Sequence, residues 1–208
     1  MKIRIRRILV PVFFCLAVAC LIEIPLAETT IFGEDVILWD TLFRAVVAVP
    51  VLIHFYQEDQ VFRGKAVWGL REAAACAAAG AVLSLVSGFL LNVFNGADYG
   101  MVNENLLTGS VWLEFFVLLF ASPLLEELFF RGVFYQRLKE LVSPAAAALG
   151  SAVFFGLYHG NLSQGIYGFF MGLFLAYSME KCRTVKAPVV MHAAANLAAL
   201  VFSAMNLP

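Results

Sequence analysis

Three groups of polar side chains interrupt segments that are otherwise apolar enough to cross a membrane. The first is residues 126–131 (EELFFR), the second ends at His159, and the third contains His192 and Asn196. A charged side chain within the hydrocarbon core costs about 2.5–3.5 kcal/mol on insertion scales, so such groups are retained where they have a function. Carboxylates and imidazoles can take a proton from water, and imidazoles and carboxamides can donate hydrogen bonds to an oxyanion. These residue types therefore indicate hydrolysis inside a membrane.

The composition predicts the class of protein that must position these residues. Of the 208 residues, 62% are hydrophobic and 14% are charged, whereas soluble domains are about 45–50% apolar and about 25% charged. Apolar stretches near the ~20 residues that a spanning helix needs predict an all-α, polytopic membrane protein, with residues 1–208 as one integral membrane domain. The seven predicted spans are residues 8–27, 36–56, 73–94, 110–135, 144–159, 164–179 and 187–206.

The distribution of basic residues predicts the orientation of these spans. Of the 14 Lys and Arg residues, Arg44 and Arg131 lie inside predicted spans, and the other twelve precede the first span or lie in the loops after the second, fourth and sixth. Cytoplasmic loops are enriched in Lys and Arg. The N-terminus is therefore predicted to be cytoplasmic and the C-terminus to lie outside. The charged residues of the opposite loops are all acidic, namely Glu28, Glu34, Asp35, Asp98 and Glu104.

The first predicted span has one alternative interpretation. Its basic start and apolar run also fit a signal peptide. Residues 25–27 (PLA) are, however, a poor cleavage site, and the sequence that ends at Cys20 only loosely resembles a lipoprotein box. A membrane-spanning first helix is therefore the favoured prediction.

The two adjacent glutamates are predicted to differ in role. Glu127 and Arg131 are four residues apart, so they share a helix face and can neutralise each other. Glu126 is turned about 100° away, as any adjacent helical position is. This leaves Glu126 free for catalysis. The alternative is that both carboxylates belong to one structural ion-pair cluster.

The histidine motifs also have structural alternatives. His159 ends its span, and the polar residues 160–165 that follow are predicted to form a buried turn lining a wet cavity, because polar backbone at membrane depth must be satisfied by protein or water. His192 and Asn196, at positions i and i+4, form a polar stripe on an Ala-rich helix. For His159, the alternative is a histidine that caps a helix at the membrane surface. For His192 and Asn196, the alternative is interhelical hydrogen bonding that only stabilises packing.

Taken together, the three motifs resemble a known family. Glu-Glu-x-x-x-Arg, Phe-x-x-x-His and His-x-x-x-Asn occur in this order within about residues 110–206. This resembles the catalytic core of the CPBP family, which comprises the CAAX prenyl endopeptidases and the bacteriocin-processing and immunity-associated (Abi) proteins. The resemblance implies an intramembrane endopeptidase, with its site in a polar cavity among the fourth, fifth and seventh helices.

The resemblance also implies a role for each motif residue. Glu126 and His159 would activate the attacking water. His192 and Asn196 would stabilise the oxyanion. The supporting ion pair would be Glu127 and Arg131.

No cofactor is expected, and a zinc site is the alternative. Glu126, His159 and His192 match the ligand types of catalytic zinc, but the H-E-x-x-H arrangement that would make this interpretation specific is absent. A serine nucleophile is not indicated, because Ser122 is followed by Pro123 and no G-x-S-x-G element occurs. Metal-free hydrolysis is therefore favoured.

The expected substrate is a peptide or a membrane-anchored protein, in leader, sorting-signal or CAAX-type processing. The expected partners are this substrate and the lipid bilayer, without nucleic acid, and the expected location is a bacterial cytoplasmic membrane. A non-catalytic peptide-binding or immunity protein is the alternative from another class. A transporter is a third, suggested by Asp40 and Arg44 within a span, although these two residues most simply form an intrahelical ion pair.

Overall fold

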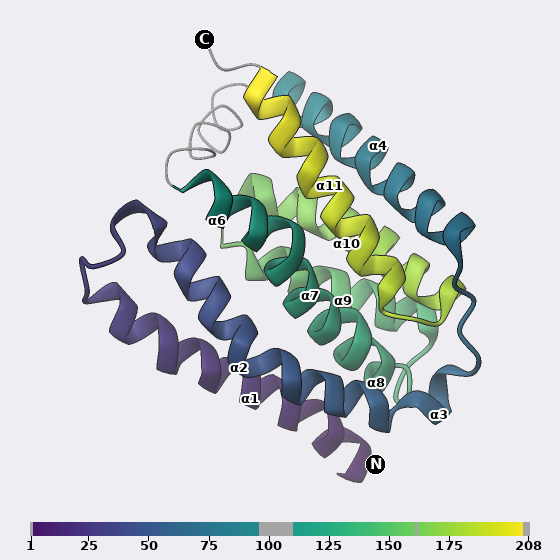
Figure 1. Cartoon of the computed structure of the whole chain (residues 1–208). Helices are drawn as coiled ribbons and strands as arrows, with labels where there is room; N and C mark the ends of the chain where they lie inside the picture. The colour runs from purple at the N-terminus through teal and green to yellow at the C-terminus, as the bar shows by residue number, and fades with distance from the viewer. Residues whose placement is uncertain (1, 96–109, 161, 206–208) are drawn as a thin grey trace.

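The computed structural model describes residues 2–95, 110–160 and 162–205, of which residues 90–95 are described by their backbone alone. The regular elements in these ranges are helices (Figure 1). The longer helices are α1 (Lys2–Ala27), α2 (Val36–Glu58), α4 (Leu70–Asn95), α9 (Pro144–Tyr158), α10 (Leu162–Cys182) and α11 (Lys186–Met205). The short ones outside the central helix are η1 (Gly33–Asp35) and α3 (Gln60–Arg63).

A nearly continuous helix over residues 111–138 runs through the middle of the bundle (Figure 1). Two π-helical segments interrupt its α-helical geometry, and such segments are rare and frequently lie at functional sites. Pro123 has no N–H to donate to the helix, and one π-helical segment ends just before Ser122. The consecutive parts are α6 (Val111–Phe116), the π-helical η2 (Val117–Ala121), α7 (Ser122–Glu127), the π-helical η3 (Leu128–Tyr135) and α8 (Gln136–Leu138).

The other helices surround this central helix in pairs. α1 packs against α2, α9 against α10, and α4 against α11 along much of its length (Figure 1). The central helix contacts α2 on one side and α9, α10 and α11 on others. The candidate residues therefore lie either on the central helix itself, in α7 and η3, or on α9 and α11, which contact it.

Glycines allow the closest of these contacts. A Cβ atom on Gly80 of α4 would lie 2.0 Å from the carbonyl oxygen of Met191 on α11, which no side chain could tolerate. A Cβ atom on Gly156 of α9 would lie 2.6 Å from the carbonyl oxygen of Gly165 on α10. Small residues at such crossings let backbones approach closely in membrane proteins. The pairs α4–α11 and α9–α10 are packed in this way.

All seven predicted spans coincide with helical segments, and four helices of the described residues are long and apolar enough to cross a membrane. α9 is shorter than these four, and the central helix is divided by its π-helical segments. The described residues confirm the all-α fold with several helices that could span a membrane, while the seven-span topology stays a prediction. The four candidate spans are Lys2–Ala27, Gly33–Glu58, Leu70–Phe89 and Lys186–Met205.

Two predicted boundaries are wrong. α1 begins at Lys2 rather than at residue 8, because its basic residues continue the helix, and Arg7 among them pairs with Asp59 and Glu140 of other elements. The turn predicted over residues 160–165 is shorter, because Gly160 adopts a φ of 66° and α10 already begins at Leu162. Because α10 begins at Leu162, Gly165 lies within this helix and packs against the backbone of Gly156 on α9. Asn161, Asp98 and Glu104 lie outside the described residues.

Candidate active site

Glu127, Arg131 and His192 form one buried network. Arg131 Nη1 donates to Glu127 Oε1 over 3.0 Å, and both side chains have no exposed surface. His192 Nδ1 lies 2.8 Å from the same oxygen. The predicted ion pair between Glu127 and Arg131 is therefore present, and His192 ties it to α11.

Glu126 lies beside this network but binds a different residue. Its Oε1 atom accepts a hydrogen bond of 2.5 Å from Ser122 Oγ, one turn earlier in α7. Its Oε2 atom is buried and has no hydrogen-bond partner among the described residues. A carboxylate oxygen can accept a hydrogen bond or a proton, so Oε2 is available to a water molecule. The two adjacent carboxylates thus have different partners, as their positions on a helix predict.

His159 is held by the backbone at the end of α9. Its Nδ1 atom lies 2.8 Å from the carbonyl oxygen of Phe155. A carbonyl oxygen only accepts, so Nδ1 carries a hydrogen and the lone pair of the neutral ring is at Nε2. A Cβ atom on Gly168 of α10 would lie 3.2 Å from Nδ1, so glycine there lets α10 pack against the ring. These contacts fix an imidazole whose Nε2 can act as a base.

Phe155 connects the three motifs. Its ring centroid lies 4.8 Å from that of His159 and 5.9 Å from that of His192, both edge to face. The guanidinium carbon of Arg131 lies 4.1 Å from the same centroid, a distance at which a cation and an aromatic face attract. Residues of the central helix, α9 and α11 therefore meet around one buried ring, which is 2% exposed.

Asn196 contacts the central helix through its carboxamide. Its Nδ2 atom donates to the carbonyl oxygen of Leu118, in the π-helical segment η2, over 2.8 Å. A carboxamide nitrogen carries two hydrogens, so one is left for another acceptor. The polar stripe of His192 and Asn196 therefore faces the central helix.

Buried polar atoms without a partner gather in this region. Among the described residues, eight buried side-chain nitrogens and oxygens have no hydrogen-bond partner, and half of them belong to the first motif. In folded proteins such atoms are normally satisfied, and those that are not require an explanation. A site that receives water and substrate provides one. The four atoms are Glu126 Oε2, Glu127 Oε2, Arg131 Nε and Arg131 Nη2.

A second ion pair approaches the site from α2. Asp40 and Arg44 form the predicted intrahelical ion pair. Arg44 Nη1 also donates to the hydroxyl oxygen of Tyr158 over 3.1 Å. The α2 ion pair is therefore connected to the residue that precedes His159.

The residues as placed do not fit the zinc alternative. Within the described part of the chain, no group of three or more His, Cys, Asp and Glu side chains could hold a metal ion.

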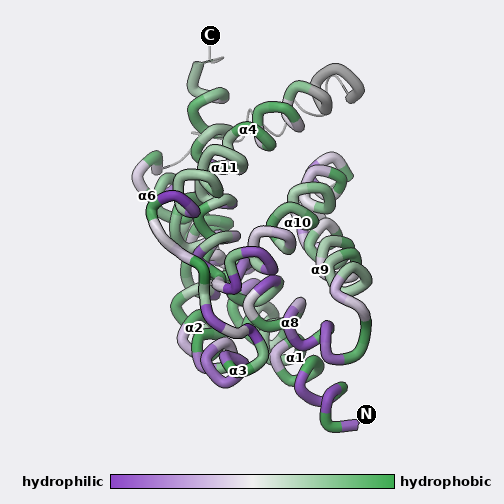
Figure 2. Tube along the Cα trace, turned by 90° about the vertical axis from the view of Figure 1, so that its right-hand side faces the viewer, coloured by the Kyte–Doolittle hydropathy of each residue, from purple (hydrophilic) through white to green (hydrophobic). Residues whose placement is uncertain are grey.

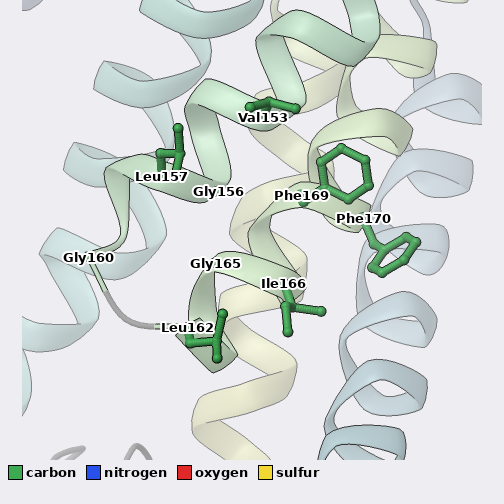
Figure 3. A pocket seen from close by; sticks show the side chains of 9 residues that line it. All are labelled: Val153, Gly156, Leu157, Gly160, Leu162, Gly165, Ile166, Phe169 and Phe170. Atoms are coloured by element: carbon green, nitrogen blue, oxygen red, sulfur yellow. The ribbon is translucent and has the colours of Figure 1, made fainter.

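An apolar cavity of about 630 Å³ lies beside the turn after His159. Figure 3 shows the side chains of Leu157, Ile166 and Phe170 around it, between α9 and α10. This cavity is not the polar one predicted among the fourth, fifth and seventh helices, which stays a prediction. Its position makes it a candidate for an apolar part of a substrate.

Sequence reasoning missed several residues of this region. Ser122, considered only as a nucleophile, is one helical turn before Glu126, and this spacing could have suggested the hydrogen bond. Gly172 was also missed, although a Cβ atom there would lie 2.9 Å from Arg131 Nη2; its i, i+4 spacing from Gly168 was the available signal. No sequence signal connects Arg44 to Tyr158, because the two are 114 residues apart.

The fold is a bundle of helices that includes four candidate membrane spans, and residues of the three motifs meet around Phe155 within it. Residues 108–198 match the family model described as Type II CAAX prenyl endopeptidase Rce1-like. The match contains all three motifs, so the predicted CPBP and CAAX protease family is confirmed for this segment. The apolar helices and the protease family together identify an integral membrane protein. No curated protein and no solved structure was found to match the chain.

Proposed function

We propose that this protein is an intramembrane endopeptidase in which Glu126 and His159 activate water. The observation that carries the proposal is the meeting of all three motifs around Phe155, with Glu126 beside them. The Rce1-like match supports a protease of this general type. The dependence of catalysis on Glu126 is the part of this proposal that an experiment must test.

Water activation follows from the free atoms of Glu126 and His159. Glu126 Oε2 has no partner in the described structure, and the Nε2 atom of a neutral His159 carries a lone pair. Glu126 takes a proton from water, the oxygen attacks the scissile carbonyl carbon, and the proton is later passed to the leaving amine.

Oxyanion stabilisation is assigned to His192 and Asn196. The second amide hydrogen of Asn196 is available after its bond to Leu118. His192 Nδ1 donates to the Glu127 carboxylate, so its Nε2 atom can donate only when the ring is protonated. Glu127 stabilises that imidazolium. Preorganised donors of this kind are usually the largest single contribution to catalysis.

The substrate is proposed to be a peptide or a membrane-anchored protein whose apolar part enters the cavity between α9 and α10. Leader, sorting-signal and CAAX-type processing all supply such a substrate. The cavity lies beside the turn after His159 (Figure 3), so an apolar group there would place the adjoining peptide bond near this histidine.

We also propose the seven-span topology with a cytoplasmic N-terminus, in a bacterial cytoplasmic membrane. Hydrophilic residues gather near the N-terminus, α3 and α8, at one end of the bundle (Figure 2). Arg7 and Arg137 contact Asp59 at this end. A basic end of this kind agrees with the positive-inside rule.

Comparative peptidomics of cells that produce the wild type or Glu126→Gln tests the enzyme proposal. A membrane-proximal fragment lost in Glu126→Gln is the expected result. Glu34→Gln, a change in an exposed carboxylate of η1, is the control and should leave that fragment unchanged. Identical profiles for all three proteins would reject catalysis and favour a non-catalytic peptide-binding protein.

A further inference from the structure

A cavity of about 570 Å³ lies at the end of the bundle where the described chain begins, and no residue of the three motifs lines it. It is lined by residues of α1, the end of α2, α3 and α8. Its charged lining residues are three arginines and one glutamate, namely Arg6, Arg7, Arg137 and Glu58. Figure 2 shows hydrophilic residues around the N-terminus, α3 and α8. The cavity therefore combines positive charge with a position at one end of the membrane helices.

Two of these arginines are held in place by buried Asp59. Arg7 Nη2 pairs with Asp59 Oδ1, and Arg137 Nε lies 2.7 Å from Asp59 Oδ2. Asp59 has only 1% of its surface exposed. Arg137 Nη1 donates to the carbonyl oxygen of Arg7 over 2.7 Å. The arginine wall of the cavity is therefore preorganised by contacts between α1, α8 and the turn after α2.

Donors remain on this wall after the internal ion pairs are made. Arg7 pairs with Asp59 and with Glu140 through the same nitrogen, Nη2, and its side chain stays 30% exposed. Arg6 is exposed, and no carboxylate of the described residues pairs with it in the structure. Planar guanidinium groups bind phosphate oxygens with paired hydrogen bonds. Arg6 and Arg7 can thus supply an anion site.

The remainder of the lining is apolar. Ile3 and Phe62 are 78% and 61% exposed, and Val10 is 44% exposed. A free phosphate ion would make no use of these side chains. A phospholipid would, because its acyl chains need an apolar surface next to the site that binds its headgroup. Basic pockets at the cytoplasmic ends of membrane helices bind anionic headgroups on this principle.

We propose that this cavity binds an anionic phospholipid, with Arg6 and Arg7 on the phosphate and Ile3, Val10 and Phe62 against the acyl chains. The bound lipid joins α1 to α3 and thereby stabilises the amino-terminal helix pair. This proposal does not depend on the proposed hydrolysis, because none of its residues belongs to the three motifs.

The test measures lipid binding to the purified full-length protein in neutral detergent by native mass spectrometry. The probes are phosphatidylglycerol, phosphatidylcholine and soluble glycerol phosphate. We expect phosphatidylglycerol to bind the wild type at least fivefold more tightly than phosphatidylcholine. Arg6→Gln should weaken phosphatidylglycerol binding at least fivefold and should fold normally, since this side chain is exposed.

Arg71→Gln is the matched control, because Arg71 is also an exposed arginine on the predicted cytoplasmic side and does not line the cavity. It should retain wild-type binding. Ile3→Ala should weaken the lipid but leave any glycerol phosphate binding unchanged, because Ile3 is an exposed apolar residue of the lining. Equal losses in Arg6→Gln and Arg71→Gln would show a general surface attraction. Equal affinity for phosphatidylglycerol and phosphatidylcholine would also overturn the proposal, as would glycerol phosphate binding as tightly as the lipid.

Discussion

His192 Nδ1 lies 2.8 Å from Glu127 Oε1, the oxygen that also binds Arg131. This contact joins the third motif to the first across two helices. Because the Glu127 carboxylate accepts from both partners, it is committed to holding Arg131 and His192. Each glutamate keeps an Oε2 atom without a hydrogen-bond partner among the described residues, but the Glu126 carboxylate binds only Ser122 and is not committed to a charged partner.

Changes in the ion pair should reduce stability. Glu127→Ala and Arg131→Ala each leave a buried charge without its partner, which typically costs about 3–5 kcal/mol. We expect both variants to accumulate less and to melt at a lower temperature in detergent. Glu126→Ala should accumulate normally and lack activity. If all three variants accumulated equally and Glu127→Ala alone were inactive, Glu127 would be the catalytic carboxylate and Glu126 the supporting one.

Asn196→Ala separates an oxyanion donor from a packing contact. Loss of one oxyanion donor typically costs about 10²–10³ in turnover, whereas an interhelical hydrogen bond in a membrane averages about 0.6 kcal/mol of stability. We expect turnover to fall at least tenfold at a nearly unchanged melting temperature, with substrate binding preserved. Asn196→Asp should be no better, because an ionised carboxylate cannot donate. Near-normal turnover with a lowered melting temperature would assign Asn196 to packing with Leu118 instead.

Chelation tests the metal-free mechanism. Purified protein treated exhaustively with a zinc chelator should keep its activity, since Glu126 and His159 are proposed to act on water directly. The treated and untreated samples should be compared for turnover and for metal content. Activity that is lost on chelation and restored by added zinc would require a metal site.

Gly80→Ala should destabilise the pairing of α4 with α11. The added Cβ atom would lie 2.0 Å from the Met191 carbonyl oxygen, so the two helices must separate, and overpacking of this kind typically costs about 1–3 kcal/mol. We expect a lower melting temperature, and also lower turnover because Met191 precedes His192.

Gly150→Ala is the control for this change. Its Cβ atom would lie 3.2 Å from Leu138 Cδ2, at the flexible end of a side chain, and alanine favours a helix over glycine by up to about 1 kcal/mol. Its melting temperature should stay the same or rise. A Gly80→Ala variant as stable as Gly150→Ala would contradict the close packing of α4 and α11.

The sequence by itself predicted the features that depend on local helix geometry. Glu127 and Arg131 pair, and so do Asp40 and Arg44, because residues four apart share a face of any helix. All seven apolar segments are helical, since runs of this length and composition form helices in a membrane. The order of the three motifs was sufficient to predict the family.

Only the tertiary structure decided which distant groups meet. His192 and Glu127 are separated by 65 residues, and sequence spacing carries no information on the rotation of α11 against the central helix. That rotation places His192 on Glu127 and Asn196 on Leu118. The start of α10 was mispredicted for a related reason: its polar first residues suggested a turn, whereas contact of Gly165 and Gly168 with α9 favours a helix. Packing between helices, which depends on side-chain shape across the whole bundle, determined the geometry of the site.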